Sequence, residues 1–249
     1  MKISQIRHFL LASTLIAGSV ISLSALSAIS LDRTRVVFDG SQKSVSINIA
    51  NKNKQLPYLA QGWIENSEGK KITSPFVVLP PIQRIEPDKA SQVRIEALPE
   101  VKNLPQDRES IFYFNLREIP PKSDKPNVLQ LALQSKIKMF YRPAAIVEQG
   151  NDTIPAQKLV MIKQGDSVML KNPTPFYITI TNGASSKSAL NKVNMNAAMI
   201  APFAETKLDI KASALGSKPV LTYINDYGGR PDLTFQCQGN TCSVVPELK

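Results

Sequence analysis

Apolar and polar residues alternate in one segment after another, and this pattern constrains the fold more than any other feature. The clearest instance is NVLQLALQSKIKMFYRP, residues 127–143. One parity carries the apolar residues Leu129, Leu131, Leu133, Ile137 and Met139, and the other carries glutamine and lysine. Because successive side chains of a strand point to opposite faces, we predict one long strand over Val128–Phe140. A strand of about thirteen residues, against the usual five or six, either crosses a sandwich core or is available to another chain.

Shorter alternating segments separated by turn residues fill the rest of the chain. No segment carries apolar residues at i, i+3, i+4 and i+7 over three turns, so we expect an all-β fold. About seven strands with a turn every eight to twelve residues are typical of an immunoglobulin-like sandwich. The predicted strands are 34–38, 45–49, 58–65, 76–79, 92–97, 111–116, 167–170, 177–181, 206–210, 220–224, 233–237 and 242–245.

Two dipeptides and one polar stretch complete the prediction of local structure. Asn182-Gly183 and Gly228-Gly229 are typical of turns that need a positive φ. Residues 185–196 are polar with only a weak helical tendency, and we expect a loop there.

The chain opens with a predicted secretory signal peptide, residues 1–27. Lys2 and Arg7 precede an uncharged, mostly apolar run, which ends in the small-x-small sequence Ala25-Leu26-Ser27. A retained anchor is the alternative, because about 18 uncharged residues can just span a bilayer. Five serine and threonine residues in the run favour cleavage after Ser27, which would leave no membrane span.

Cleavage would leave 222 of the 249 residues, enough for two sandwich domains of roughly 100 residues each. The polar stretch 148–152 lacks apolar residues and indicates the link between them. We therefore predict an N-terminal immunoglobulin-like domain over 28–146 and a C-terminal one over 147–249.

Residue counts exclude several kinds of chemistry. The only histidine is His8, inside the predicted signal peptide, which excludes histidine-activated nucleophiles and histidine metal sites from the mature chain. Two cysteines cannot supply the four thiolates of an all-cysteine zinc site. We expect no cofactor, no metal and no enzyme activity. The net charge of +10 comes from scattered lysines and arginines without a basic run, so nucleic acid is not expected as a partner.

Cys237 and Cys242 are separated by four residues, Gln238-Gly239-Asn240-Thr241. In an exported protein we expect a structural disulfide that closes a tight hairpin. A redox-active pair is disfavoured because redox motifs have two intervening residues.

Several motifs, in the same order, resemble the periplasmic pilus chaperones across essentially all of the predicted mature chain. They are LDRTRVVFDG at 31–40, QDRESIFYFNLREIPP at 106–121, FYRPAAI at 140–146 and YINDYGGRP at 223–231. The resemblance implies two immunoglobulin-like domains at an angle, with a cleft between them. It also implies a periplasmic protein that binds, folds and caps pilus subunits and delivers them to an outer-membrane usher.

The resemblance assigns the long strand to donor-strand complementation, in which it fills the groove of an incomplete subunit. The groove-filling positions would be Leu129, Leu131 and Leu133. Arg35 and Lys138 would bind the C-terminal carboxylate of the subunit. The implied interdomain salt bridge consists of Glu109, Arg142 and Asp226. The sequence leaves open whether the free protein covers this apolar strand by self-association.

Two other functions compete with this one. A structural pilin or adhesin subunit would carry an extra donor segment before its first sandwich, whereas the first predicted strand here follows the cleavage point closely. A secreted hydrolase has little support, because histidine and close carboxylate motifs are lacking.

Overall fold

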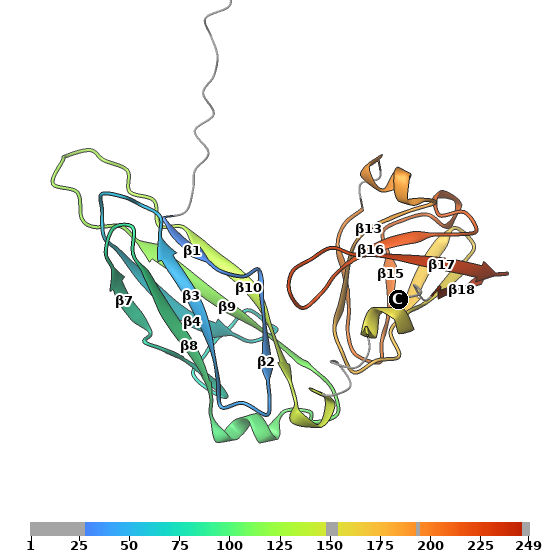
Figure 1. Ribbon diagram of the computed structural model, residues 1–249, viewed down its shortest axis with the longest axis horizontal. Helices are drawn as coiled ribbons and strands as arrows, with labels where there is room; N and C mark the ends of the chain where they lie inside the picture. The colour runs from blue at the N-terminus through green and yellow to red at the C-terminus, as the bar shows by residue number, and fades with distance from the viewer. Residues whose placement is uncertain (1–27, 148–153, 193–194, 246–249) are drawn as a thin grey trace, which may run out of the picture.

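The computed structural model describes residues 28–147, 154–192 and 195–245. They form two β domains side by side, with a separate buried core in each (Figure 1). The predicted all-β class is confirmed. The predicted signal peptide at 1–27 and the predicted link at 148–152 lie outside the described residues, so the predicted domain bounds stay predictions. Within the described residues, no helix has both the length and the apolar character needed to cross a membrane.

The N-terminal domain is a sandwich of two sheets. The first has the order β1-β3-β8-β6, and the second has the order β2-β10-β9-β4-β5, with β7 also paired to β4. A 3₁₀ helix, η1 (Pro99–Asn103), joins β8 to β9. The strands are β1 (Ile29–Leu31), β2 (Arg35–Asp39), β3 (Ser44–Asn51), β4 (Tyr58–Glu65), β5 (Lys71–Ile72), β6 (Phe76–Leu79), β7 (Ile82–Ile85), β8 (Ala90–Ala97), β9 (Ser110–Ile119) and β10 (Gln134–Arg142).

Aromatic rings hold the two sheets of this sandwich together. Phe76 of the first sheet lies 5.2 Å from Phe38 and 5.0 Å from Phe112 of the second sheet, measured between ring centroids. Such tilted and edge-on pairs add about 0.5–1.5 kcal/mol beyond the area that they bury. The inward parity of β10 contributes Met139 and Tyr141 to the same core, so its other parity faces outward.

The C-terminal domain is one sheet that curls around its core, in the order β14-β13-β16-β17-β18-β11-β12-β15. Its outermost strands β14 and β15 follow each other in the chain and contact each other. The strands are β11 (Val160–Gln164), β12 (Ser167–Lys171), β13 (Ile178–Ala184), β14 (Ala198–Ile200), β15 (Glu205–Leu208), β16 (Val220–Ile224), β17 (Asp232–Gln238) and β18 (Thr241–Val244). The 3₁₀ helices are η2 (Pro155–Lys158), η3 (Lys187–Lys192) and η4 (Ala212–Ala214).

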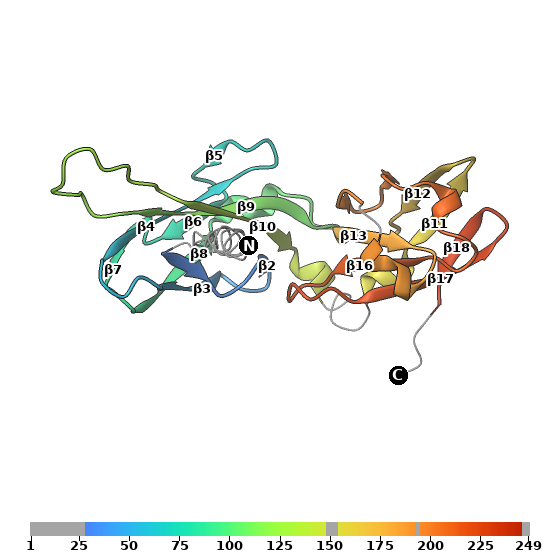
Figure 2. The same ribbon diagram turned by 90° about the horizontal axis from the view of Figure 1, so that it is seen from above.

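The prediction of one long strand over Val128–Phe140 is wrong for the first half of that range. Strand β10 begins at Gln134, and residues 128–133 have no strand assignment. The physical reason is the end of β9: the Glu118 N–H still donates to Leu133 O at 3.0 Å, but β9 ends at Ile119 and offers no partner to the residues before Ala132. Residues 120–133 instead form an arm that projects from the end of the domain farthest from the C-terminal domain (Figure 2).

Two smaller predictions are also wrong. Asn182-Gly183 is not a turn but lies inside β13, where the register with β16 shifts between Ile180 and Asn182. Gly183 is needed for packing, because a Cβ there would lie 2.6 Å from Leu221 Cδ2. The stretch 185–196 contains the 3₁₀ helix η3 rather than only loop. The turn predicted at Gly228 is confirmed, with φ of 84°.

Candidate functional site

The outward face of β10 and its neighbours lies against the C-terminal domain. Lys138, Phe140 and Arg142 occupy this face, and in the parallel β2–β10 ladder their register partners are Arg35, Val37 and Asp39. In both views the loop between β16 and β17 reaches toward this face (Figures 1 and 2). The contacts between the domains therefore converge on the C-terminal half of β10.

Arg35 and Lys138 are brought together by this ladder. They are direct register partners, although about a hundred residues separate them in the sequence. Arg35 Nη1 donates to the carbonyl oxygen of Ile224 in the C-terminal domain at 3.4 Å, and its guanidinium lies 5.9 Å from the Phe140 ring centroid. Arg35 Nε is buried and has no hydrogen-bond partner among the described residues. The pair can accept an anionic ligand, because it retains donors that the fold does not use.

Burial lowers the pKa of Lys138, and the adjacent Arg35 charge lowers it further. Burial likewise lowers the pKa of Arg35, while the charges of Asp226 and Glu109 oppose that effect. Two half-buried cations side by side repel each other, so a carboxylate placed between them would favour the charged form of both.

The β2–β10 ladder begins at this pair and leaves part of β10 open. β2 pairs only with Lys138–Arg142, whereas β9 pairs with β10 from Gln134. Among the residues that the structure describes, the segment Gln134–Ile137 therefore has one paired edge and one free edge. A free strand edge presents unpaired N–H and C=O groups that can pair with another chain.

The arm beyond this free edge carries the three leucines of the predicted groove-filling set. Leu129, Leu131 and Leu133 are 83%, 64% and 38% exposed. They are not part of either core. Neighbouring exposed leucines on one short segment are unusual for a monomer and indicate a binding surface.

Glu109, Arg142 and Asp226 form an ion-paired group across the two domains. Arg142 Nε donates to Glu109 Oε1 at 2.9 Å, and Arg142 Nη1 lies 2.9 Å from Asp226 Oδ2. Glu109 Oε2 accepts a 2.7 Å bond from the backbone N–H of Tyr177, and Glu109 N donates to Pro175 O at 2.9 Å. One buried carboxylate thus binds both domains.

Burial raises the pKa of Glu109 to about 7, although Arg142 and the Tyr177 N–H act in the opposite direction. Burial lowers the pKa of Arg142, but the charges of Glu109 and Asp226 outweigh burial and raise it overall. The Glu109 carboxyl therefore titrates near neutral pH, far above an exposed glutamate.

Aromatic contacts between the domains were not predicted from the sequence. The rings of Phe140 and Tyr177 lie 5.6 Å apart, and the Arg108 guanidinium lies 5.0 Å from the Phe203 ring centroid. Phe140 falls on the outward parity of its strand, which is a weak signal that it packs against another unit. Nothing in the local sequence identifies Tyr177 as the counterpart of Phe140, or Phe203 as the counterpart of Arg108.

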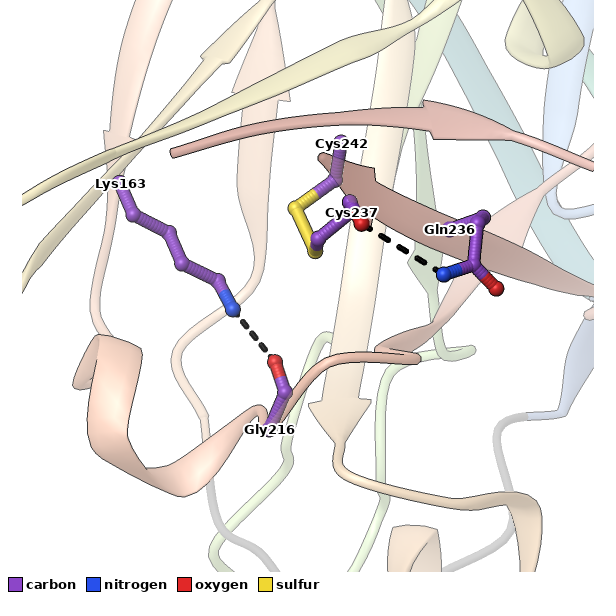
Figure 3. Close-up of a disulfide and its surroundings, with 5 residues drawn as sticks. All are labelled: Lys163, Gly216, Gln236, Cys237 and Cys242. Atoms are coloured by element: carbon purple, nitrogen blue, oxygen red, sulfur yellow. Dashed lines mark hydrogen bonds between the residues drawn. A yellow bond between two sulfur atoms is a disulfide. The ribbon is translucent and has the colours of Figure 1, made fainter. Parts of the chain in front are cut away.

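The predicted disulfide between Cys237 and Cys242 is present (Figure 3). The two cysteines are register partners on β17 and β18, next to the two-residue turn Gly239-Asn240. Lys163 donates to the carbonyl oxygen of Gly216 nearby, and Gln236 Nε2 donates to Cys237 O at 3.5 Å. This hairpin lies at the end of the C-terminal domain away from β10 (Figure 2). The described residues contain no group of three or more metal-ligating side chains that could hold a metal ion.

Comparison with known proteins identifies the family. The model for the N-terminal domain of the PapD pili and flagellar-assembly chaperones matches residues 28–147, and the model for the PapD C-terminal domain matches residues 155–235. The chaperone protein PapD of Escherichia coli is 51% identical over 222 residues, which cover 89% of this chain and 91% of that protein. The chaperone protein PmfD of Proteus mirabilis is 44% identical, with 94% of each chain covered.

Solved structures agree with this result. The CupB2 chaperone of Pseudomonas aeruginosa superposes with a TM-score of 0.68 at 30% identity, covering 84% of this chain and all of that one. The periplasmic chaperone SfaE superposes with a TM-score of 0.66 at 31% identity, covering 83% of this chain and 98% of that one. These matches favour neither a hydrolase nor a structural pilin. The chain therefore belongs to the PapD family of pilus-assembly proteins, which are chaperones and not enzymes.

Proposed function

We propose that this chaperone acts in the periplasm and captures pilus subunits by donor-strand complementation. In this mode a strand of one protein pairs with the open sheet edge of another through main-chain hydrogen bonds. Family membership supports the role, and the free edge at Gln134–Ile137 supplies the surface that it requires.

The single observation that carries the proposal is the position of the Arg35–Lys138 pair at the start of the β2–β10 ladder. A subunit strand added to the free edge would lie in line with β2 and run parallel to β10. Its C-terminal carboxylate would then meet the unused donors of Arg35 and Lys138. Such an anchor sets the register, since a slip of one residue would turn every groove-facing side chain to the other side.

The leucines of the arm supply the apolar part of the binding energy. Leu129, Leu131 and Leu133 share the parity of Ile137 and Met139, so extension of β10 through the arm would place all three on one face. Burial of three leucines in a subunit groove contributes roughly 4.5–9 kcal/mol before ordering costs. Because the arm pairs with no strand in the described parts of the chain, we infer that it becomes strand only when the subunit binds.

Delivery of the captured subunit to an outer-membrane usher completes the proposed role. The Glu109–Arg142–Asp226 group would hold the angle between the domains, so that the cleft keeps a shape that fits the subunit. Self-association of the free chaperone through the same apolar arm is a second proposed use of this surface.

Co-purification tests the proposal. The chaperone and a pilus subunit are expressed together, and the complex is isolated by a tag on the subunit. We expect a soluble one-to-one complex with the unchanged chaperone, and loss of the complex with Lys138→Ala or Arg35→Ala. Lys54→Ala, an exposed lysine between β3 and β4, is the matched control. Normal recovery of the subunit with both Lys138→Ala and Arg35→Ala would contradict the proposal that these residues bind its carboxylate.

A further inference from the structure

A cavity of about 500 Å³ lies between β2 and the loop that joins β16 to β17. Arg33 and Arg35 line it from the N-terminal domain, and Asp226 and Tyr227 line it from the C-terminal domain. Tyr227 is 96% exposed, so its ring packs against almost nothing in the protein. This large, exposed aromatic side chain lines the same cavity as Arg35 and makes almost no contact of its own.

The turn that carries Tyr227 is held firmly. The side-chain oxygen of Asn225 accepts hydrogen bonds from the backbone N–H groups of Tyr227, at 3.1 Å, and Gly229, at 2.8 Å. Gly228 has φ of 84°, and a Cβ there would lie 2.5 Å from Thr34 Oγ1 of the N-terminal domain. The turn therefore abuts the start of β2 closely, and the Tyr227 backbone is already ordered before any ligand arrives.

The hydrogen-bonding side chains around the cavity have partners within the described parts of the protein, with one exception. Asp32 binds Arg33 through two bonds of 2.8 and 2.9 Å, and Asp226 pairs with Arg142 at 2.9 Å. Asp39, which also lines the cavity, accepts bonds from the N–H and hydroxyl of Ser41 at 2.8 and 2.6 Å. The exception is Arg35, whose buried Nε has no partner in the described parts of the chain.

The cavity thus offers a ligand the Arg35 guanidinium and one free aromatic ring. These two features fit the end of a polypeptide: a carboxylate for Arg35, and an uncharged, preferably apolar or aromatic, side chain for the ring. An acidic side chain would lie close to the Asp32, Asp39 and Asp226 carboxylates and would lose hydration.

We propose that Tyr227 is a specificity-determining residue that packs on the last side chain of the captured subunit and favours an aromatic or aliphatic residue over a polar or charged one. This inference rests on the proposed function, since it takes the C-terminal strand of a subunit as the ligand. Arg35 and Lys138 bind the terminal carboxylate of the subunit, and Tyr227 contacts the side chain of its last residue.

Short synthetic peptides test this role. They share one alternating strand sequence and a free terminal carboxylate, and they differ only in the last residue, which is Phe, Leu, Ser or Asp. Dissociation constants are measured by fluorescence anisotropy with the full mature chaperone. We expect the Phe peptide to bind about tenfold more tightly than the Ser peptide, as for an aromatic pair that also buries apolar area.

Two substitutions of the ring and one control separate the possible outcomes. Tyr227→Ala should bring the Phe and Ser peptides to equal affinity, Tyr227→Phe should keep the preference, and Leu56→Ala, an exposed side chain on the β3–β4 connection, should leave it unchanged. An unchanged Phe-to-Ser ratio in Tyr227→Ala would overturn the proposal, as would failure of every peptide to bind the unchanged protein.

Amidated peptides report on the anchor separately. Amidation should weaken all four peptides by a similar factor, because it removes the carboxylate without changing the last side chain. If amidation has no effect while the Tyr227→Ala effect is as expected, the carboxylate anchor of the proposed function fails and the side-chain preference stands.

Discussion

Lys138 lies directly opposite Arg35 in the parallel β2–β10 ladder, at the point where that ladder begins. Neighbouring strands are about 4.8 Å apart, so the two cationic side chains leave the sheet side by side on the same face. The fold holds like charges together at the end of a free strand edge, where the terminal carboxylate of an added strand would fall.

Capture of a subunit should weaken at alkaline pH. Burial and Arg35 lower the pKa of Lys138, so Lys138 loses its charge at a pH below the ordinary value of 10.5. A bound carboxylate favours the charged form, so affinity should fall as pH rises through the lowered pKa. Titration calorimetry across the alkaline range would show the decline. In Lys138→Arg the guanidinium stays charged, so a decline of equal size would point to another group.

Leu131→Glu should weaken binding of every subunit. The change removes about 1.5–3 kcal/mol of apolar burial and adds a charge to the groove, so affinity should fall by about a hundredfold or more. Because Leu131 is 64% exposed in the free protein, the thermal midpoint should stay within a degree or two of the unchanged chain. Leu131→Met is the conservative control. If one subunit is affected and others are not, the leucines do not fill a common groove.

Stability should decrease between mildly acidic and neutral pH because of Glu109. Its pKa in the folded protein, about 7, exceeds the unfolded value of 4.5. The folded state therefore binds the proton more tightly, and the associated stability, present in full below the unfolded pKa, is lost as pH rises through the folded pKa. The loss is of the order of 3 kcal/mol.

Urea unfolding at several pH values would measure the effect, and Glu109→Gln is its control. The glutamine cannot ionise, so the variant should lack this part of the pH dependence. Identical pH profiles for the variant and the unchanged chain would show that Glu109 is not the titrating group.

Removal of the disulfide should destabilise the C-terminal domain alone. The loop closed by Cys237 and Cys242 is short, so the double substitution to serine should cost about 2 kcal/mol. Hydrogen exchange would locate the loss in the strands near β17 and β18, with β9 and β10 unaffected. Faster exchange in the N-terminal domain as well would mean that the two cores unfold as one unit.

The alternation of side chains was sufficient to predict most of the strands, because a two-residue period is a local property. It predicted β4, β6 and β16 at their observed ends. It missed β1, β5, β7, β11 and β14, which have two to five residues; of these, all but β11 pair with a longer neighbour. At Asn182-Gly183 the sequence predicts a turn, but the structure has a strand. Glycine is required at position 183 because of close packing against Leu221.

By itself, the sequence determined an all-β chain, a disulfide hairpin and a segment with three leucines on one parity. The tertiary structure decided where that segment stops being strand, since a strand needs a partner and β9 ends at Ile119, one residue beyond the Glu118 N–H that donates to Leu133 O. It also decided that Arg35 meets Lys138, that Arg142 binds both Glu109 and Asp226, and that Tyr227 stands unpacked in the cleft. These relationships join residues far apart in the chain, and only the packing of two finished domains brings such residues within contact distance.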